Sequence, residues 1–340
     1  MPVEVDTGLA TLSDQLILVT VLLYVIAMIG YALQLGFGRA AARASAAPVR
    51  ELATVGGRSA AADAPETPDA QDTHRDGQED AQDGAEAAAK AGNAAPRPGF
   101  AERAGTIAVV LTWLGWATNL GSIMTRGLAV DRWPWGNMYE FVVAIAFAAV
   151  TVFLLMQLRY PVRFLGAFVA LAATLSLGFA VRYLHVQAGP VVPALNSYWV
   201  AIHVSAAIAA SGLFIVGGVS GILYLVRGEK PSRLPSRAEL EAIAHRVVVL
   251  AFPIWTFAVI AGALWADKAW GRYWGWDPKE VWAFITWIAY AAYLHARATA
   301  GWRGRAAVIV QLIAFGCLLF NLIGVNMFLG GLHSYADVPN

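Results

Sequence analysis

The segment between residues 270 and 280 concentrates side chains that could bind a ligand. Its sequence is Trp270-Gly-Arg-Tyr-Trp-Gly-Trp-Asp-Pro-Lys-Glu280, and six tryptophans fall between positions 265 and 287. Tryptophan is a large, rigid, apolar surface with one N–H donor, so several together form a flat apolar platform. Such a platform suits a flat apolar ligand, and a porphyrin is the obvious candidate. The alternative is an aromatic belt at a membrane interface, where Trp and Tyr are enriched.

Two histidines could supply axial ligands to a haem iron, a position that histidine commonly fills. His203 ends Asn196-Ser-Tyr-Trp-Val-Ala-Ile-His, and His333 ends Gly330-Gly-Leu-His. We expect both at the same membrane face as the tryptophan segment, where they would converge on one iron. The alternative is two interfacial histidines bonded to backbone, which is the commoner use of histidine. Ionisable groups at membrane depth are nevertheless default candidates for function.

A third histidine, His295, is expected at the other end of its helix. It lies fifteen residues after Glu280, which is about 22 Å along a helix. It therefore cannot share a ligand with His203 and His333. At a second, inner haem position the other ligand would come from a partner chain or be absent, and the alternative is an interfacial histidine beside Arg297. The other histidines are expected to be solvated or at most accessory: His74, His185 and His245.

Asp277 is a carboxylate among aromatic rings, which is costly unless it is paired. Asp277-Pro-Lys-Glu280 resembles a helix start, with an N-cap, Pro at the first position and Glu at the third. We expect Asp277 to begin a helix first and to contact the ligand's surroundings second. Basic residues on the same side could pair with haem propionates: Arg126, Arg132, Arg182, Arg272 and Lys279.

A second aromatic motif runs from Trp133 to Phe141. It contains a Pro/Gly turn, and Asn137 and Glu140 open the helix that follows. It is either a simple turn or an extension of the platform's wall.

The composition indicates a polytopic membrane protein. Of 340 residues, 58% are hydrophobic and 14% are charged, and the net charge is +1. This balance argues against a nucleic-acid partner. Cys317 is the only cysteine, so the chain lacks a disulfide, a CxxC pair and a covalent c-type haem site of its own. Glu4 and Asp6 at the start, before a long apolar stretch, argue against a cleavable signal peptide.

The apolar pattern predicts an all-α bundle with about eight transmembrane helices, each long enough to cross about 30 Å of hydrocarbon. The predicted spans are Leu16–Phe37, Ile107–Leu128, Phe141–Leu158, Phe164–Ala180, Tyr198–Val226, Val247–Trp265, Glu280–His295 and Ala307–Leu329. The domains expected are a first helix (1–37), a linker (38–104) and a membrane domain (105–340) with an external segment (266–280).

Arginines and lysines cluster in the loops after the third, fifth and seventh spans, and by the positive-inside rule these loops are cytoplasmic. We therefore expect a multi-pass protein of the cell membrane, with both termini and the tryptophan segment outside. Residues 38–104 are rich in Ala, Gly, Pro and acidic residues and have few large apolar side chains. Such a segment cannot offset its ordering entropy, so we expect a disordered cytoplasmic linker.

Several motifs resemble those of a known family. Trp270-Gly-x-x-Trp274-x-Trp276-Asp277 is similar to the WWD signature of haem-handling proteins of cytochrome c biogenesis. Further motifs resemble the CcsA/ResC branch (also labelled CcsB) of the system II cytochrome c synthase: Asn137-Met-Tyr-Glu-Phe141, Val192-Pro-Ala-Leu-x-Ser-x-Trp-x-x-x-His203, Pro278-Lys279-Glu280-x-Trp282, Tyr293-Leu-His295-x-Arg297 and Gly331-Leu-His333-Ser-Tyr335. The resemblance covers the chain from about Gly127 to the C-terminus.

This resemblance implies roles for individual residues. His203 and His333 would be external axial ligands, and His295 a transmembrane ligand for haem moving outward. Trp270, Trp274, Trp276 and Asp277 would belong to the haem-binding platform. The haem (haem b) would be substrate, and no catalytic side chain is assigned. A ResB/Ccs1-type membrane subunit would complete the synthase and supply the missing histidine, and an apocytochrome c with a reduced CxxCH would receive the haem.

The sequence departs from the family in places and leaves rival functions open. Ala244-His245-Arg246 stands where the family often has Ser-Tyr-Arg, and the first helix and linker are uninformative. One rival is a system I relative, either CcmC or CcmF, although the Pro-Lys-Glu motif and the length argue against them. Others are a plain haem transporter and a b-type cytochrome, which would normally need paired histidines on facing helices.

Overall fold

The structure is a computed structural model that describes residues 5–55, 99–192, 195, 197–228 and 232–333, with the backbone alone over 39–55. In these ranges the protein is all-α, with no strand. The long helices are α1 (Thr7–Val55), α3 (Phe100–Ala129), α4 (Met138–Arg159), α5 (Gly166–Phe179), α6 (Tyr198–Arg227), α7 (Arg237–Trp270), α8 (Pro278–Thr299) and α9 (Gly304–Leu319). Short turns join or extend them: η1 (Arg163–Leu165), the π-helical η2 (Ala180–Leu184) and η4 (Phe320–Gly324), and α10 (Val325–Phe328).

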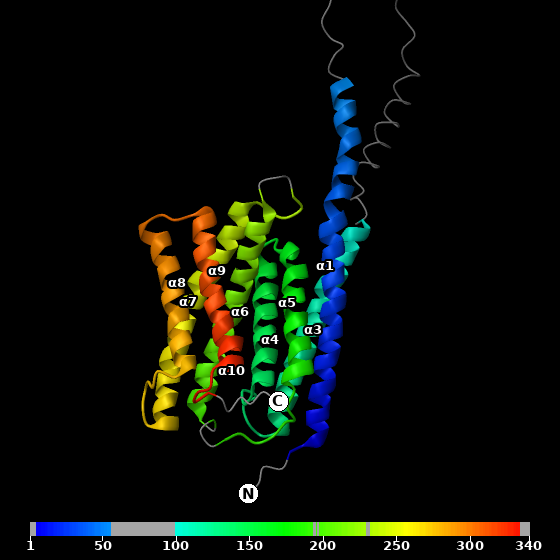
Figure 1. The fold of residues 1–340 in the computed structure, drawn as a ribbon. Helices are drawn as coiled ribbons and strands as arrows, with labels where there is room; N and C mark the ends of the chain where they lie inside the picture. Colours follow the sequence, from blue (N-terminus) through cyan, green and yellow to red (C-terminus); the bar gives the residue numbers. More distant parts are fainter. Residues whose placement is uncertain (1–4, 56–98, 193–194, 196, 229–231, 334–340) are drawn as a thin grey trace, which may run out of the picture.

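The predicted membrane bundle is confirmed. Seven of the eight predicted spans lie inside these helical elements, and the eighth, Ala307–Leu329, ends one residue beyond α10. In the described ranges seven spans are long and apolar enough to cross a membrane. The remaining one is α8, whose 22 residues extend about 33 Å but are less apolar. It runs alongside α7 and α9 (Figure 1), so it completes the bundle from the side.

The first membrane-crossing helix lies where the sequence predicts it, over Thr7–Gly38. The helical backbone of α1 continues beyond this span to Val55, into the range expected for the linker. The apolar pattern does not indicate this polar extension. Residues 56–98 lie outside the described ranges, so a disordered linker stays a prediction there.

Helix α6 lies at the centre of the bundle. It packs against α4, α7 and α9, while α1 and α3 form a pair at one side and α8 lies at the other (Figure 1). The Phe214 ring of α6 stacks on Tyr290 of α8, with centroids 3.8 Å apart. The central position of α6 places its first turns between the elements that build the site.

Segments far apart in the sequence meet at one end of the bundle (Figure 1). This end contains the start of α1, the α3–α4 connection, the start of α6, the tryptophan segment between α7 and α8, and the end of α10. The opposite end contains the arginine-bearing connections after α4, α6 and α8. The bundle therefore separates the two groups of loops as predicted, while the side that each faces stays a prediction.

A buried ion-pair network fixes the α3–α4 connection. The Glu140 carboxylate accepts from Arg126 Nε at 2.9 Å, from Arg132 Nη1 at 2.9 Å and from the Gly136 amide at 2.7 Å. The side chains of Arg126 and Glu140 are 3% and 1% exposed. Because the side chain of Asn137 caps the Glu140 amide, the network and the cap together position the turn that carries Trp135.

We expect Glu140→Gln to destabilise the bundle by about 3–5 kcal/mol, because it removes the buried carboxylate that Arg126 and Arg132 share. The midpoint of thermal unfolding in detergent, followed by tryptophan fluorescence, measures this. Asp14→Asn is the control, since Asp14 is 40% exposed and lies 3.5 Å from Arg126. It should cost at most about 1 kcal/mol, and equal losses in the two variants would contradict the prediction.

Candidate functional site

His203 lies in the second turn of α6 with one ring nitrogen already bonded. Its Nδ1 is 2.7 Å from the carbonyl oxygen of Ala258 in α7. A carbonyl only accepts, so Nδ1 carries the proton and Nε2 keeps a lone pair. A Cβ at Gly262 would lie 2.7 Å from His203 Cε1, closer than real Cβ atoms approach. Glycine at 262 therefore makes the space in which this imidazole sits.

His333 is held in the same way by a carboxylate. Its Nδ1 is 2.7 Å from Asp277 Oδ2, across 56 residues of chain. The tautomer that donates from Nδ1 leaves Nε2 as an acceptor. His333 follows α10, so Asp277 ties the end of the last helix to the start of α8.

Asp277 accepts hydrogen bonds from the first turn of α8 and from the segment that follows α10. Oδ2 also caps the Lys279 amide at 3.1 Å, and Oδ1 accepts from the Leu332 amide at 2.5 Å. A Cβ at Gly331 would lie 2.3 Å from Oδ1, so only glycine permits this approach. Burial alone would raise the pKa of Asp277, but the bonds from His333 and Leu332 outweigh it and hold that pKa below its usual value. The predicted N-cap at Asp277 is confirmed. The contact between Asp277 and His333 was not predicted from the sequence.

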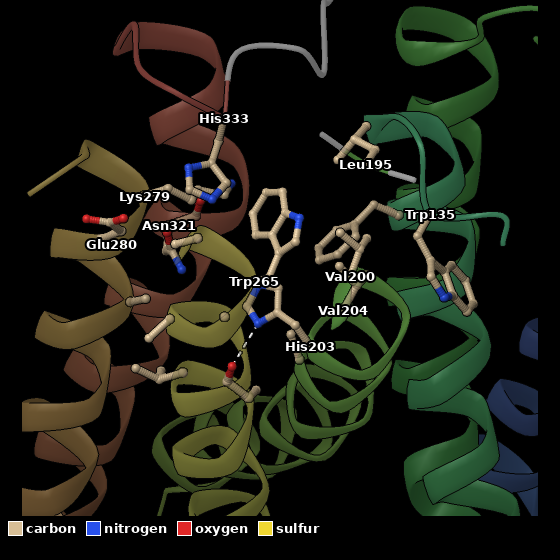
Figure 2. Close-up of a pocket in the computed structure, with 18 of the residues that line it drawn as sticks. Trp135, Leu195, Val200, His203, Val204, Trp265, Lys279, Glu280, Asn321 and His333 are labelled. Carbon is tan, nitrogen blue, oxygen red and sulfur yellow. Dashed lines mark hydrogen bonds between the residues drawn. The ribbon is translucent and has the colours of Figure 1, made fainter. Parts of the chain in front are cut away.

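Two tryptophans contact the imidazoles. The Trp265 indole is nearly parallel to the His203 ring at 6.1 Å between centroids, and its edge contacts His333 at 5.7 Å. Trp270 packs edge-on against His333 at 5.2 Å and against Trp265 at 4.8 Å. Figure 2 shows the Trp265 indole between the two histidines.

His203 and His333 line one cavity of about 150 Å³ that opens in part to the surroundings. Its walls come from α4, α6, α7, α8, η4 and the segment before α6 (Figure 2). Its lining is mostly apolar, as is usual for ligand pockets, so its walls suit a flat apolar ligand.

The tryptophan segment divides between the cavity and the surface. Trp274 lines the cavity with Trp270, but Trp276 is absent from its lining. Trp276 is 70% exposed and packs edge-on against Trp274. Its φ of +57° lies in the left-handed region that costs a non-glycine residue energy. This backbone turn directs the Trp276 ring outward.

Glu280 shapes the loop that precedes α8. Its Oε2 accepts from the amides of Gly275 at 2.8 Å and Asp277 at 3.1 Å, which completes a capping box with Asp277. The loop therefore has a fixed path, and Trp274 and Lys279 both project into the cavity from it.

Only one of the five basic candidates lines the cavity. Arg126 and Arg132 are engaged with Glu140 instead. Arg182 lies over the Tyr183 ring, and Arg272 is exposed beside Gly275. Lys279 alone contributes to the cavity wall.

The second aromatic motif does extend the wall. Trp135, Asn137, Met138 and Phe141 all line the cavity, so this motif is more than a turn before a helix.

The remaining histidines lie away from the cavity. His295 is exposed near the C-terminal end of α8, in the part of the bundle opposite to His203 and His333. His245 is partly buried in α7, with Nδ1 3.3 Å from the Tyr293 hydroxyl, so our expectation of a solvated loop residue was wrong. His185 lies 3.2 Å from Asp14 and contacts the Tyr139 ring. His74 lies outside the described ranges.

Several residues that line the cavity are absent from the candidates predicted from the sequence. Asn321 and Asn326 occur within the last apolar span, and Gly262 lies within α7. Polar amides inside a span that must cross a membrane are a sequence signal for such residues. No pattern identifies Gly262, because its role depends on an imidazole from another helix.

The fold and the cavity define a class: a multi-pass membrane protein with a tryptophan-lined pocket and two oriented histidines at one end of the bundle. Residues 135–333 match the model of a family described as cytochrome C assembly protein. The match covers more than half of the chain, and it begins and ends at residues that line the cavity, Trp135 and His333. The chain belongs to this family.

Similar curated proteins carry the name "Cytochrome c biogenesis protein CcsA". That of Chlamydomonas reinhardtii is 36% identical over 224 residues, which span 63% of this chain and 64% of that protein. The protein of Synechococcus elongatus is 33% identical over 284 residues, 68% of this chain and 86% of its own length. The protein of a Synechocystis species is 32% identical over 273 residues, which span 62% of this chain and 82% of that protein. This chain is therefore a CcsA-type protein of cytochrome c biogenesis.

We expect Asp277→Asn to loosen the segment that carries His333. Asn caps a helix as well as Asp does, but it has one acceptor oxygen and cannot serve the Lys279 and Leu332 amides together. Hydrogen exchange should become faster at residues 330–333 while the start of α8 stays protected. Asp267→Asn is the control, because Asp267 pairs only with the exposed Lys268. Unchanged exchange at Leu332 would refute the prediction.

Proposed function

We propose that this chain is the haem-handling subunit of a system II cytochrome c synthase, which holds haem b between His203 and His333. The observation that carries the proposal is the pair of occupied Nδ1 atoms. Metal-bound histidines usually donate their other ring N–H to a carbonyl or carboxylate, which fixes the tautomer and the ring orientation. Both imidazoles of this cavity already have that arrangement at Nδ1, and Nε2 is the ring nitrogen that would bind iron.

The walls also suit the haem. Trp265, Trp270 and Trp274 offer flat apolar surface, and aliphatic side chains of α6 and α7 complete the lining. A porphyrin would transfer its large apolar faces onto these groups and keep its iron at the histidines. The cavity lies at one end of the bundle and is partly open, as delivery of haem to another protein requires.

In the proposed reaction the protein contributes position, and the haem with its recipient contributes the chemistry. The two thiols of a reduced CxxCH in an apocytochrome c would add across the haem vinyl groups. The histidine of that motif would then replace one axial ligand, which releases the product.

His295 would handle haem at the inner side. Its exposure on α8 directs it away from the bundle, where a ResB/Ccs1-type membrane subunit would supply the second ligand. We propose that the arginine-rich end is cytoplasmic, since positive loops are retained there. Both termini and the tryptophan segment would then lie outside the plasma membrane, and His203 and His333 would receive haem after His295.

The alternatives are less well supported. The relatives above are CcsA proteins, which favours the system II role over a CcmC- or CcmF-like one. A plain transporter would not need two imidazoles oriented toward one cavity. A b-type electron carrier would not need a cavity that opens at the end of the bundle.

If His203 and His333 are axial ligands, the purified full-length chain with its partner should show the low-spin absorption of bis-histidine haem. Either single alanine variant should become high-spin, and the double variant should lose the signal. His185→Ala is the matched control, because His185 lies at the same end without lining the cavity. An unchanged spectrum in the double variant would overturn the assignment.

If His295 handles inner haem, His295→Ala should lower haem occupancy at the outer site several-fold in cells. Haem supplied to the purified variant should still give the bis-histidine spectrum, because His203 and His333 are intact. His245→Ala tests whether any histidine at that end has the same effect. Normal occupancy and normal cytochrome c maturation in His295→Ala would count against the role.

A further inference from the structure

The cavity has one polar corner, formed by Lys279 in the first turn of α8 and by Asn321 in η4. Lys279 Nζ donates to the backbone carbonyl of Asn321 at 2.7 Å. Asn321 belongs to a π-helical turn, and such turns occur frequently at functional sites. Figure 2 shows both residues on the α8 side, opposite Trp135 and Leu195.

Asn321 has a polar group without a partner. The residue is 4% exposed, and its Oδ1 has no hydrogen bond in the structure. Such an orphaned buried atom costs about 1–3 kcal/mol. Oxygen and nitrogen of an amide can exchange places by a flip, so the side chain can present a donor to a ligand in the cavity. The neighbouring Asn326 uses its Nδ2 on the Leu322 carbonyl at 2.6 Å.

Lys279 is likewise incompletely paired. An ammonium has three donors, and the Asn321 carbonyl takes one. Within the part of the chain that the structure describes, no carboxylate lies within 4.0 Å of Nζ. Asp277 is engaged with His333 and Leu332, and Glu280 with the amides of Gly275 and Asp277. A buried cation is costly unless it is paired, so this corner suits an anion.

We propose that Lys279 and Asn321 bind a propionate carboxylate of the haem and so set the orientation of the ring within the cavity. This inference rests on the function proposed above. In haem b the vinyl groups lie on the half of the ring opposite the propionates. Anchoring the propionates beside α8 and η4 turns the vinyl half toward Trp135 and Leu195. The polar corner therefore determines which edge of the haem the apocytochrome thiols meet.

The test compares haem with its dimethyl ester, in which both propionates are uncharged. Each is titrated into the full-length chain, purified with its partner and freed of haem, and binding is followed by absorption. The wild type should bind haem about 10- to 100-fold more tightly than the ester, as expected for a charge-assisted pair. Lys279→Met should remove that preference by weakening haem alone, and Lys279→Arg should retain most of it.

Two further variants sharpen the comparison. Asn321→Asp keeps the shape of the side chain but adds a negative charge, so it should weaken haem and leave the ester unchanged. Lys268→Met is the matched control, because this lysine is 65% exposed and pairs with Asp267; it should leave the preference intact.

The outcomes separate this inference from the function on which it rests. Equal weakening of haem and ester by Lys279→Met, or equal affinity of the wild type for both, overturns the propionate assignment while the bis-histidine spectrum upholds the site. A wild-type spectrum without histidine ligation overturns both.

Discussion

The hydrogen bond between Asp277 and His333 is the interaction on which the site depends most. One carboxylate caps α8, holds the Leu332 amide and orients the imidazole. Lys279 belongs to α8, whereas Leu332 and His333 follow α10. The site therefore forms only when α8 and the end of α10 are correctly packed. Because burial would favour the neutral acid, the donors around it must keep Asp277 ionised. Folding of the bundle and orientation of the His333 imidazole are therefore coupled through the Asp277 side chain.

The two histidines are positioned by different means. His203 is fixed by helix packing, with a carbonyl of α7 on one side and the space above Gly262 on the other. His333 is fixed by a side chain in a connecting segment. Backbone outside a helix needs partners that hydrocarbon does not provide, so the irregular part of the site lies at the end of the bundle. The deeper half is built from regular helices, and the outer half is built from caps and turns.

The sequence predicted the spans well because a membrane demands long apolar runs. It predicted His203, His333, Trp270 and Trp274 at one site because all four lie near span ends at the same side of the bundle. It misjudged features that depend on distant partners. Arg126 and Arg132 looked available for a propionate, yet Glu140 takes both. Trp276 belongs to the motif but points outward, because one left-handed residue reverses its direction. Asn321 was not predicted, because it lies in an apolar run. The hydrophobic periodicity of that run does not indicate its π-helical turn.

Helix α8 connects the cavity with the opposite end of the bundle. Its first turn carries Lys279 and Glu280 beside the cavity, and its last turns carry the exposed His295. It is also the least apolar of the long helices and lies at the side of the bundle (Figure 1). A helix of this composition is poorly matched to lipid and well matched to protein. The proposed partner would therefore cover the same helix that joins the inner histidine to the outer cavity, and α8 would transmit partner binding to the site through the cap at Asp277.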